Sequence, residues 1–332
     1  AQVWVDKTDL ERYGGEEDFK KNLKKMFHNT TRFWNESPNK FNHYFRFVPA
    51  EELCVYDIQG DKNKYDEFKN KAYGPLDLSK YDFVLFLALG AKNEGLSCGG
   101  GGASGQSVVM CYIREPHNIF TDALYPNQGT YSNLGHEYGH MRGATDLYQY
   151  MIPAENNPVS HVAYDYPKCN MGTGYQEWSD YCSAIFNHNA QYKQITADMT
   201  RSTYPKQMLV RVTKDGKPVQ RATVNFWGSR ATFRDIYAEP GNSPYMKKKT
   251  DANGEFTIND IYRMFIPDYN NTPNLPPKSP VDEFPFSRWY CFVVEVELDG
   301  GQTKCVWLSD LDIVPEYLDG GQQEPYVFEI QL

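Results

Sequence analysis

The sequence predicts an α+β domain over residues 1–204, followed by an all-β antiparallel sandwich domain over residues 205–332. The length of 332 residues is typical of two domains. The first part mixes helical and extended hydrophobic patterns. Beyond residue 206 the pattern changes to short alternating segments that are separated by frequent turns, as in an antiparallel sandwich.

The N-terminal part begins with an expected strand at residues 2–5 and a long amphipathic helix at residues 16–36. Apolar side chains recur in this helix at steps of three and four residues, which is the helical period. These residues are Phe19, Leu23, Met26, Phe27 and Trp34, and the small polar Thr30 falls on the same face. The helix is therefore expected to bury one face against a sheet or another helix.

Further strands of this part are expected at residues 43–48, 53–56 and 81–89, with a short helix at residues 63–72. The run from Phe83 to Leu89 is wholly apolar, which is typical of a strand buried on both faces. Residues 90–106 contain four consecutive glycines and are expected to form a loop. Residues 107–113 are expected to form a further strand.

The C-terminal part is expected to contain about seven strands joined by hairpin turns. The turn signals are Asp-Gly and Asn-Gly pairs, which favour tight reversals of the chain. The expected strands cover residues 208–212, 222–227, 245–250, 255–258, 289–298, 303–308 and 325–332. The turns resemble those of Ig-like and carboxypeptidase-regulatory-like accessory domains.

The segment 135–148 carries the strongest functional signal. His136 and His140 are four residues apart, so a helix places both imidazoles on one face, where they can bind one ion. Glu137 follows the first histidine and is the candidate general base for a metal-activated water. Gly143 is expected to end the helix at positive φ and to let Asp146 return to the metal as the third ligand. The predicted cofactor is Zn²⁺.

This segment, with the letters HEYGHMRGATDLY, resembles the extended zincin motif HExxHxxGxxD. It is similar to the catalytic helices of the snapalysin and immune-inhibitor-A types of secreted peptidase, although the Leu-Pro that follows the glycine in those enzymes is Ala144–Thr145 here. It resembles the metzincins more broadly, which have histidine in the place of Asp146. The resemblance implies a zincin-like metallopeptidase domain with His136, His140 and Asp146 on zinc and Glu137 as the base. In zincin-like enzymes the edge strand of the sheet pairs with extended substrate, and the strand at 107–113 is the candidate for that role.

Other residues complete this interpretation and leave alternatives open. Met171 is a candidate for the methionine that lies under the metal in metzincins, or a plain core residue. Tyr175 is a candidate donor to the oxyanion of the tetrahedral intermediate. If Asp146 only stabilises a turn, His161 or Glu177 is the alternative third ligand.

Composition restricts the partners. The formal net charge of −9 disfavours nucleic acid as a ligand. No apolar run approaches the roughly 18 residues of a membrane-spanning helix. The chain begins Ala1–Gln2, as a mature or trimmed secreted protein would, and as a recombinantly produced fragment would too. A secreted protein, extracellular or at the cell surface, is expected, and it is expected to be a monomer. The odd count of seven cysteines leaves at least one outside any pairing within the chain.

These observations favour a secreted zinc metallopeptidase, a hydrolase that cleaves protein or peptide substrates with a water activated by Glu137. The alternative is a non-catalytic protein on a zincin scaffold, which binds zinc and acts as an adhesin or substrate-binding protein. A zinc amidase that acts on non-protein amides differs from the first hypothesis only in the shape of its cleft.

Overall fold

The computed structural model of the chain is a mixed α/β protein with two compact units. The first unit consists of Ala1–Asp146 and Lys168–Thr200, and the second of Leu147–Pro167 and Arg201–Leu332. The predicted boundary after residue 204 lies near the last of these junctions. The structure describes residues 1–36, 41–61, 63–72, 74, 77, 79–89, 96–101, 108–113, 119–120, 130–172, 176–230, 235–236, 243–267, 288–298 and 301–332.

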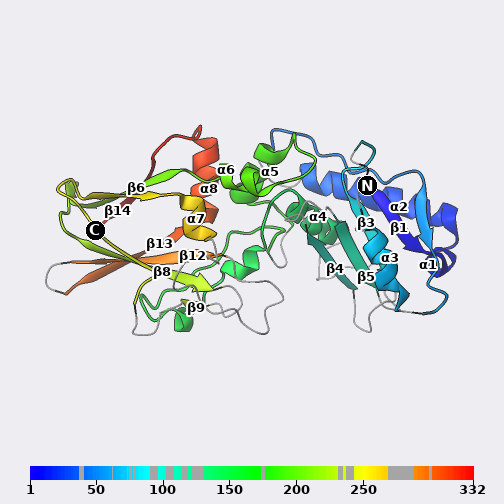
Figure 1. Ribbon diagram of the computed structural model, residues 1–332, viewed down its shortest axis with the longest axis horizontal. Helices are drawn as coiled ribbons and strands as arrows, with labels where there is room; N and C mark the ends of the chain where they lie inside the picture. Colours follow the sequence, from blue (N-terminus) through cyan, green and yellow to red (C-terminus); the bar gives the residue numbers. More distant parts are fainter. Residues whose placement is uncertain are drawn as a thin grey trace. The chain divides into compact units, whose positions relative to one another are not determined.

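The first unit is built on a five-stranded sheet in the order β2-β1-β3-β5-β4 (Figure 1). All neighbouring pairs are parallel except β4, which runs antiparallel to β5 at one edge. The strands are β1 (Gln2–Asp6), β2 (Leu53–Tyr56), β3 (Val84–Leu89), β4 (Leu96–Gly101) and β5 (Val108–Ile113). The helices of this unit are α1 (Lys7–Arg12), α2 (Glu16–Glu36), α3 (Lys64–Ala72), α4 (Thr130–Met141) and α5 (Asp180–Asn189); α6 (Ala197–Ser202) crosses into the second unit.

Helices cover both faces of this sheet because β3 is apolar on both sides. Val84, Phe86 and Ala88 belong to a buried cluster with Tyr65 and Ala72 of α3. Successive side chains of a strand point to opposite faces. The other face therefore carries Leu85 and Leu87, which are also buried. The continuous apolar run predicted this double burial.

On that second face, α2 packs against α4 and α5. All six residues predicted for the inward face of α2 are buried. Trp34 stacks on Phe186 of α5, with ring centroids 4.7 Å apart, and contacts Trp178 at the same distance. Each such aromatic pair contributes about 0.5–1.5 kcal/mol beyond its buried area. This aromatic core fixes α4, the helix that carries the histidine motif.

The prediction of a strand at residues 43–48 is wrong. The segment begins with a bend at His43, and the backbone groups of Phe45 and Phe47 bond to side chains of α2 instead of to another strand. Asn35 accepts from the Phe45 amide and donates to the Phe45 carbonyl, at 3.0 and 2.7 Å. The hydroxyl of Thr31 accepts from the Phe47 amide at 3.0 Å. Because these side chains satisfy the backbone groups, no neighbouring strand is needed.

The sequence also misplaced the edge of the sheet. The glycine-rich stretch expected as a loop contains β4, and β4 rather than the strand at 108–113 lies at the edge. Strand β5 is enclosed between β3 and β4. Helix α4 lies alongside β4. Glycine disfavours strand interiors, so composition argued against the strand that the pairing with β5 produces.

The second unit contains two further sheets. One has the order β10-β8-β12-β13, with β9 paired to β8, and is antiparallel; the other has the order β11-β6-β14, with β7 paired to β6. Phe226 of the first contacts Phe256 of the second, so their apolar faces meet. Their strands are β6 (Gln207–Lys214), β7 (Lys217–Pro218), β8 (Thr223–Arg230), β9 (Asp235–Ile236), β10 (Met246–Lys249), β11 (Glu255–Asn259), β12 (Cys291–Glu297), β13 (Thr303–Ser309) and β14 (Tyr326–Gln331).

The prediction of an all-β antiparallel domain needs two corrections. Strand β14 runs parallel to β6, and α8 (Asp310–Asp319) lies in the chain between β13 and β14. Helix α8 connects β13 of one sheet to β14 of the other. The unit also contains α7 (Ile261–Phe265) and the 3₁₀ turns η1 (Leu147–Tyr150) and η2 (Ala154–Asn156).

A buried carboxylate explains why residues 147–167 group with the second unit. Asp310, at the start of α8, is fully buried and accepts hydrogen bonds from the hydroxyls of Tyr150 and Tyr204, at 2.8 and 2.6 Å. Arg288 forms an ion pair with the same carboxylate. Ile152 packs with Trp227 and other residues of the β8–β12 sheet. Hydrogen bonds and apolar packing therefore both hold residues 147–167 against the rest of the second unit.

One buried acid in the first unit makes stability depend on pH. Asp9 is only 5% exposed, and its Oδ2 has no hydrogen-bond partner among the described residues. Burial and the charge of Asp6 raise the pKa of Asp9 to about 8, although Arg12 opposes this shift. An unfolded aspartate has a pKa of about 3.9. The folded state therefore loses stability as pH rises from about 4 to 8, because ionising Asp9 becomes favourable only in the unfolded chain.

We expect Asp9→Asn to raise the free energy of unfolding by at least about 1 kcal/mol at pH 8 and to leave it nearly unchanged at pH 4. Denaturant unfolding of the two proteins at both pH values measures the difference. Glu11→Gln, an exposed change on the same helix, is the control. An equal effect of Asp9→Asn at both pH values would contradict a raised pKa of Asp9 as the cause of the pH dependence.

Candidate metal centre

Helix α4 presents His136 and His140 on the face that points away from the aromatic core. The intervening Tyr138 is buried on the core side, where it stacks on Phe47 at 4.7 Å and contacts Phe83 at 4.6 Å. The two histidine side chains are each 18% exposed. Packing of Tyr138 thus sets the rotation of the helix and leaves both imidazoles accessible to solvent.

The turn after α4 brings Asp146 back to the histidines. Gly143 has φ of +96°, a conformation that favours glycine, and a Cβ there would lie 2.9 Å from Nδ2 of Asn189. The Gly143 amide donates to the carbonyl of His140 at 3.0 Å, which closes the helix. Asn189 also donates to the Arg142 carbonyl at 2.9 Å, so the end of α5 holds the turn in place. The positive φ predicted for Gly143 is confirmed.

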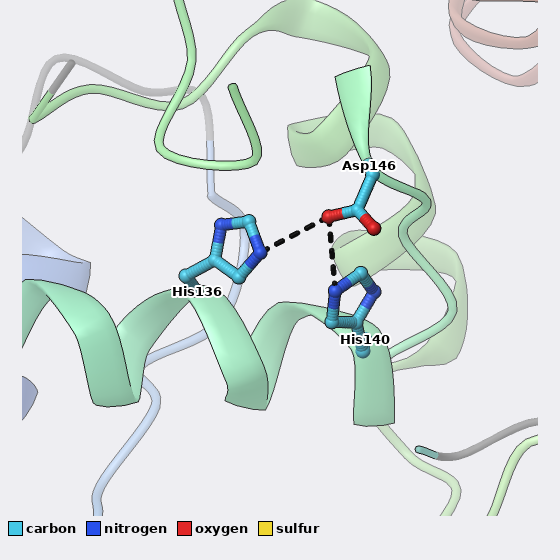
Figure 2. Close-up of side chains that lie close together, drawn as sticks. All are labelled: His136, His140 and Asp146. Carbon is cyan, nitrogen blue, oxygen red and sulfur yellow. Dashed lines mark hydrogen bonds and ion pairs between the residues drawn. The ribbon is translucent and has the colours of Figure 1, made fainter. Parts of the chain in front are cut away.

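Three ligand atoms converge at this point (Figure 2). Oδ1 of Asp146 lies 3.1 Å from Nε2 of His136 and 3.2 Å from Nε2 of His140. The Asp146 side chain is 14% exposed. Among the residues that the structure describes, these three are the group of histidine, cysteine and acidic side chains that fits a single metal ion.

The other nitrogen of each imidazole faces a backbone carbonyl. Nδ1 of His136 lies 2.7 Å from the Asn170 oxygen, and Nδ1 of His140 lies 3.1 Å from the Ala144 oxygen. A carbonyl only accepts hydrogen bonds, so each Nδ1 carries a proton. This leaves Nε2 as the ligand atom of both rings. Such outer contacts are the usual way in which proteins orient histidine ligands.

The convergence requires a positive charge. Two Nε2 lone pairs and a carboxylate oxygen repel one another unless protons or a cation lie between them. Burial by itself lowers the pKa of His140, but the hydrogen bond to Asp146 and the charges of Asp146 and Glu137 raise it to about 9. Burial likewise favours a neutral Asp146, yet the hydrogen bonds from both histidines lower its pKa well below the usual range. These three side chains can therefore hold a cation.

The spacing and chemistry of these atoms fit zinc. Zinc–nitrogen and zinc–oxygen bonds of about 2.0–2.1 Å in a tetrahedron place neighbouring ligand atoms roughly 3.3 Å apart. The two separations of 3.1 and 3.2 Å are close to this value. Two imidazoles and one carboxylate are a common donor set for catalytic zinc, which keeps its fourth position open.

The remaining predicted residues take different positions. Met171 is fully buried, and its sulfur occupies the place that a Cβ at Gly139 of α4 would need. His161 is exposed and belongs to the second unit. Glu177 is half-buried, and its backbone carbonyl accepts from the Asn170 amide at 2.6 Å. Tyr175 lies outside the described residues.

Sequence reasoning missed the carbonyls of Ala144 and Asn170. A backbone carbonyl carries no sequence signal, because every residue has one. The proximity of Asn170 to Met171 was the available clue, since a segment that packs under α4 can also reach the far side of a histidine ring.

No family model matches the chain, and no curated protein matches it significantly. Within the described part of the chain, every helix is too short or too polar to cross a membrane. The assignment of a function therefore rests on the geometry and chemistry of the site itself.

Asp146→Asn is expected to weaken zinc binding by roughly 100-fold or more, because it removes the anionic ligand while keeping the shape of the side chain. Competition with a zinc chelator of known affinity measures the change. Glu177→Gln removes the other carboxylate considered as a ligand and is expected to leave the affinity unchanged. The opposite ranking of the two variants would identify Glu177 as the ligand.

Zinc affinity is expected to rise about tenfold per pH unit between pH 6.5 and 8.5. The pKa of His140 is raised to about 9, so binding in this range must displace at least its proton, and displacement becomes easier as pH increases. The same chelator competition, repeated across the range, gives the slope. A flat profile would show that His140 does not exchange a proton for the metal.

Proposed function

We propose that the chain is a secreted, zinc-dependent endopeptidase that acts as a monomer on protein or peptide substrates. The observation that carries this proposal is the convergence of two Nε2 atoms and one carboxylate oxygen, with both Nδ1 atoms held by carbonyls. A zinc ion in such a site supplies Lewis acidity, which makes water a nucleophile near neutral pH. The solvent exposure of the three side chains supports access for water and substrate.

Glu137 is the proposed general base. It follows His136 on α4 and is 6% exposed, and its negative charge contributes to the raised pKa of His140, so it lies close to the ligand cluster. Its carboxylate accepts the proton of the attacking water and passes it to the nitrogen of the leaving amine. This role of general acid–base catalyst is worth about 10²–10⁴-fold in rate.

The edge strand supports a peptide as the substrate. Strand β4 pairs with β5 on one side only, within the sheet as described, and lies alongside α4. An extended peptide can add to such an edge through main-chain hydrogen bonds, largely independently of its side chains. This arrangement favours cleavage within an extended chain over hydrolysis of a small amide.

Glu137→Gln is expected to lower kcat for casein or a peptide library by about 10²–10⁴-fold and to keep one bound zinc ion per chain, because the amide cannot accept the proton. Turnover and metal content are measured on the same samples. Glu155→Gln, an exposed change in η2, is the control and should retain both. Unchanged turnover in Glu137→Gln would refute the catalytic role and favour a non-catalytic zinc-binding protein.

A further inference from the structure

Two buried cysteines lie in contact next to the segment that orients His136. Sγ of Cys169 is 3.3 Å from Sγ of Cys182, and both residues are fully buried. Cys169 directly precedes Asn170, whose carbonyl holds Nδ1 of His136. Cys182 lies in the first turn of α5. The contact therefore joins the segment beneath the metal helix to the start of a core helix.

We propose that Cys169 and Cys182 form a disulfide, which fixes the Cys169–Met171 segment and thereby the orientation of His136. A disulfide places the two sulfurs about 2.05 Å apart. The side chains therefore need to approach by roughly 1.2 Å from their separation of 3.3 Å. The ring that closes spans residues 169 to 182, a loop length at which a crosslink restricts the unfolded chain appreciably.

Polar groups at the start of α5 lie beside the two sulfurs. The Ser179 amide donates to Sγ of Cys169 at 3.4 Å, and the Ser179 hydroxyl accepts from the Cys182 amide at 3.3 Å, which caps the helix. Burial opposes ionisation, but hydrogen bonds from Cys182 and Ser179 lower the pKa of Cys169 to about 7. Burial raises the pKa of Cys182. In the folded chain these contacts hold the two sulfurs together and favour a thiolate at Cys169 over one at Cys182.

The oxidant is a small-molecule or protein disulfide, as found in oxidising compartments. The thiolate of one of the two cysteines attacks one sulfur of that disulfide, which forms a mixed disulfide and releases the first thiol. The other cysteine then loses its proton and attacks the protein sulfur of the mixed disulfide, which releases the second thiol. Two protein thiols are oxidised, and the external disulfide is reduced to two thiols. Since both cysteines are buried in the folded chain, the exchange belongs to folding.

The bond has a consequence for the metal centre, and this consequence rests on the proposed function. Asn170 donates its amide to the Glu177 carbonyl at 2.6 Å, and its carbonyl holds His136. Met171 packs against Gly139 between the two histidines. A crosslink at Cys169 limits the motion of this whole segment. Outer contacts of this kind change metal affinity by about 10–100-fold when they are lost.

Peptide mapping tests the bond directly. The full chain is refolded with oxidised and reduced glutathione, free thiols are alkylated under denaturing conditions, and trypsin is added. The fragment 169–193 follows Lys168, ends at Lys193 and contains two cysteines, Cys169 and Cys182. We expect this fragment to carry no alkyl group and to be lighter than its dithiol by two hydrogens. Two alkyl groups on the fragment would overturn the proposal.

Variants separate the bond from its effect on the site. Cys182→Ala should lower the Tm of the first unit by on the order of 5 °C and weaken zinc binding roughly tenfold, whereas Cys305→Ala, from the second unit, should do neither. An unchanged zinc affinity in Cys182→Ala, with the bond present in the parent chain, would overturn the orienting role. If the parent chain binds no zinc, the proposed function fails, and the mass of the fragment still decides the crosslink.

Discussion

The site depends on one electrostatic constraint. Two imidazole nitrogens and a carboxylate oxygen point at a common position, and each would repel the others without a positive charge among them. A neutral imidazole with its proton on Nε2 would avoid this repulsion. The carbonyls of Asn170 and Ala144 disfavour that arrangement, because each accepts a hydrogen bond from Nδ1 and so leaves Nε2 with a lone pair that faces the carboxylate. A proton on His140, whose pKa is raised to about 9, can supply a positive charge, and so can a divalent cation bound among the three atoms.

The rest of the first unit serves to place these atoms. The aromatic core around Trp34 fixes α2, α4 and α5, and burial of Tyr138 sets which face of α4 is turned outward. Gly139 allows Met171 to approach the helix closely, and Gly143 allows the chain to reverse. The end of α5 then holds the reversed turn through Asn189. Helix packing and two glycines therefore determine the distances between ligands that are ten residues apart in sequence.

Much of the secondary structure of the first unit, and the helix that carries the two histidines, could be predicted from local hydrophobic patterns and residue spacing. The helix at 16–36 and the strand ending at Leu89 follow from strong periodicity or continuous apolarity, and the histidine spacing required a helix at α4. The errors arose where tertiary contacts override local preference. Side chains of α2 bond the backbone of Phe45 and Phe47, pairing with β5 makes a strand of a glycine-rich stretch, and β14 pairs in parallel with β6. The backbone carbonyls that orient the histidines leave no trace in sequence.

The central claim is that one zinc ion is held by His136, His140 and Asp146 with a coordination position open to solvent. Anomalous scattering at the zinc absorption edge, measured on crystals grown with zinc, tests this most directly. The account predicts one peak per chain, about 2.0–2.1 Å from Nε2 of both histidines and from a carboxylate oxygen of Asp146, with a solvent molecule as the fourth ligand. A peak elsewhere, a fourth protein ligand that closes the site, or no peak between these side chains would contradict it.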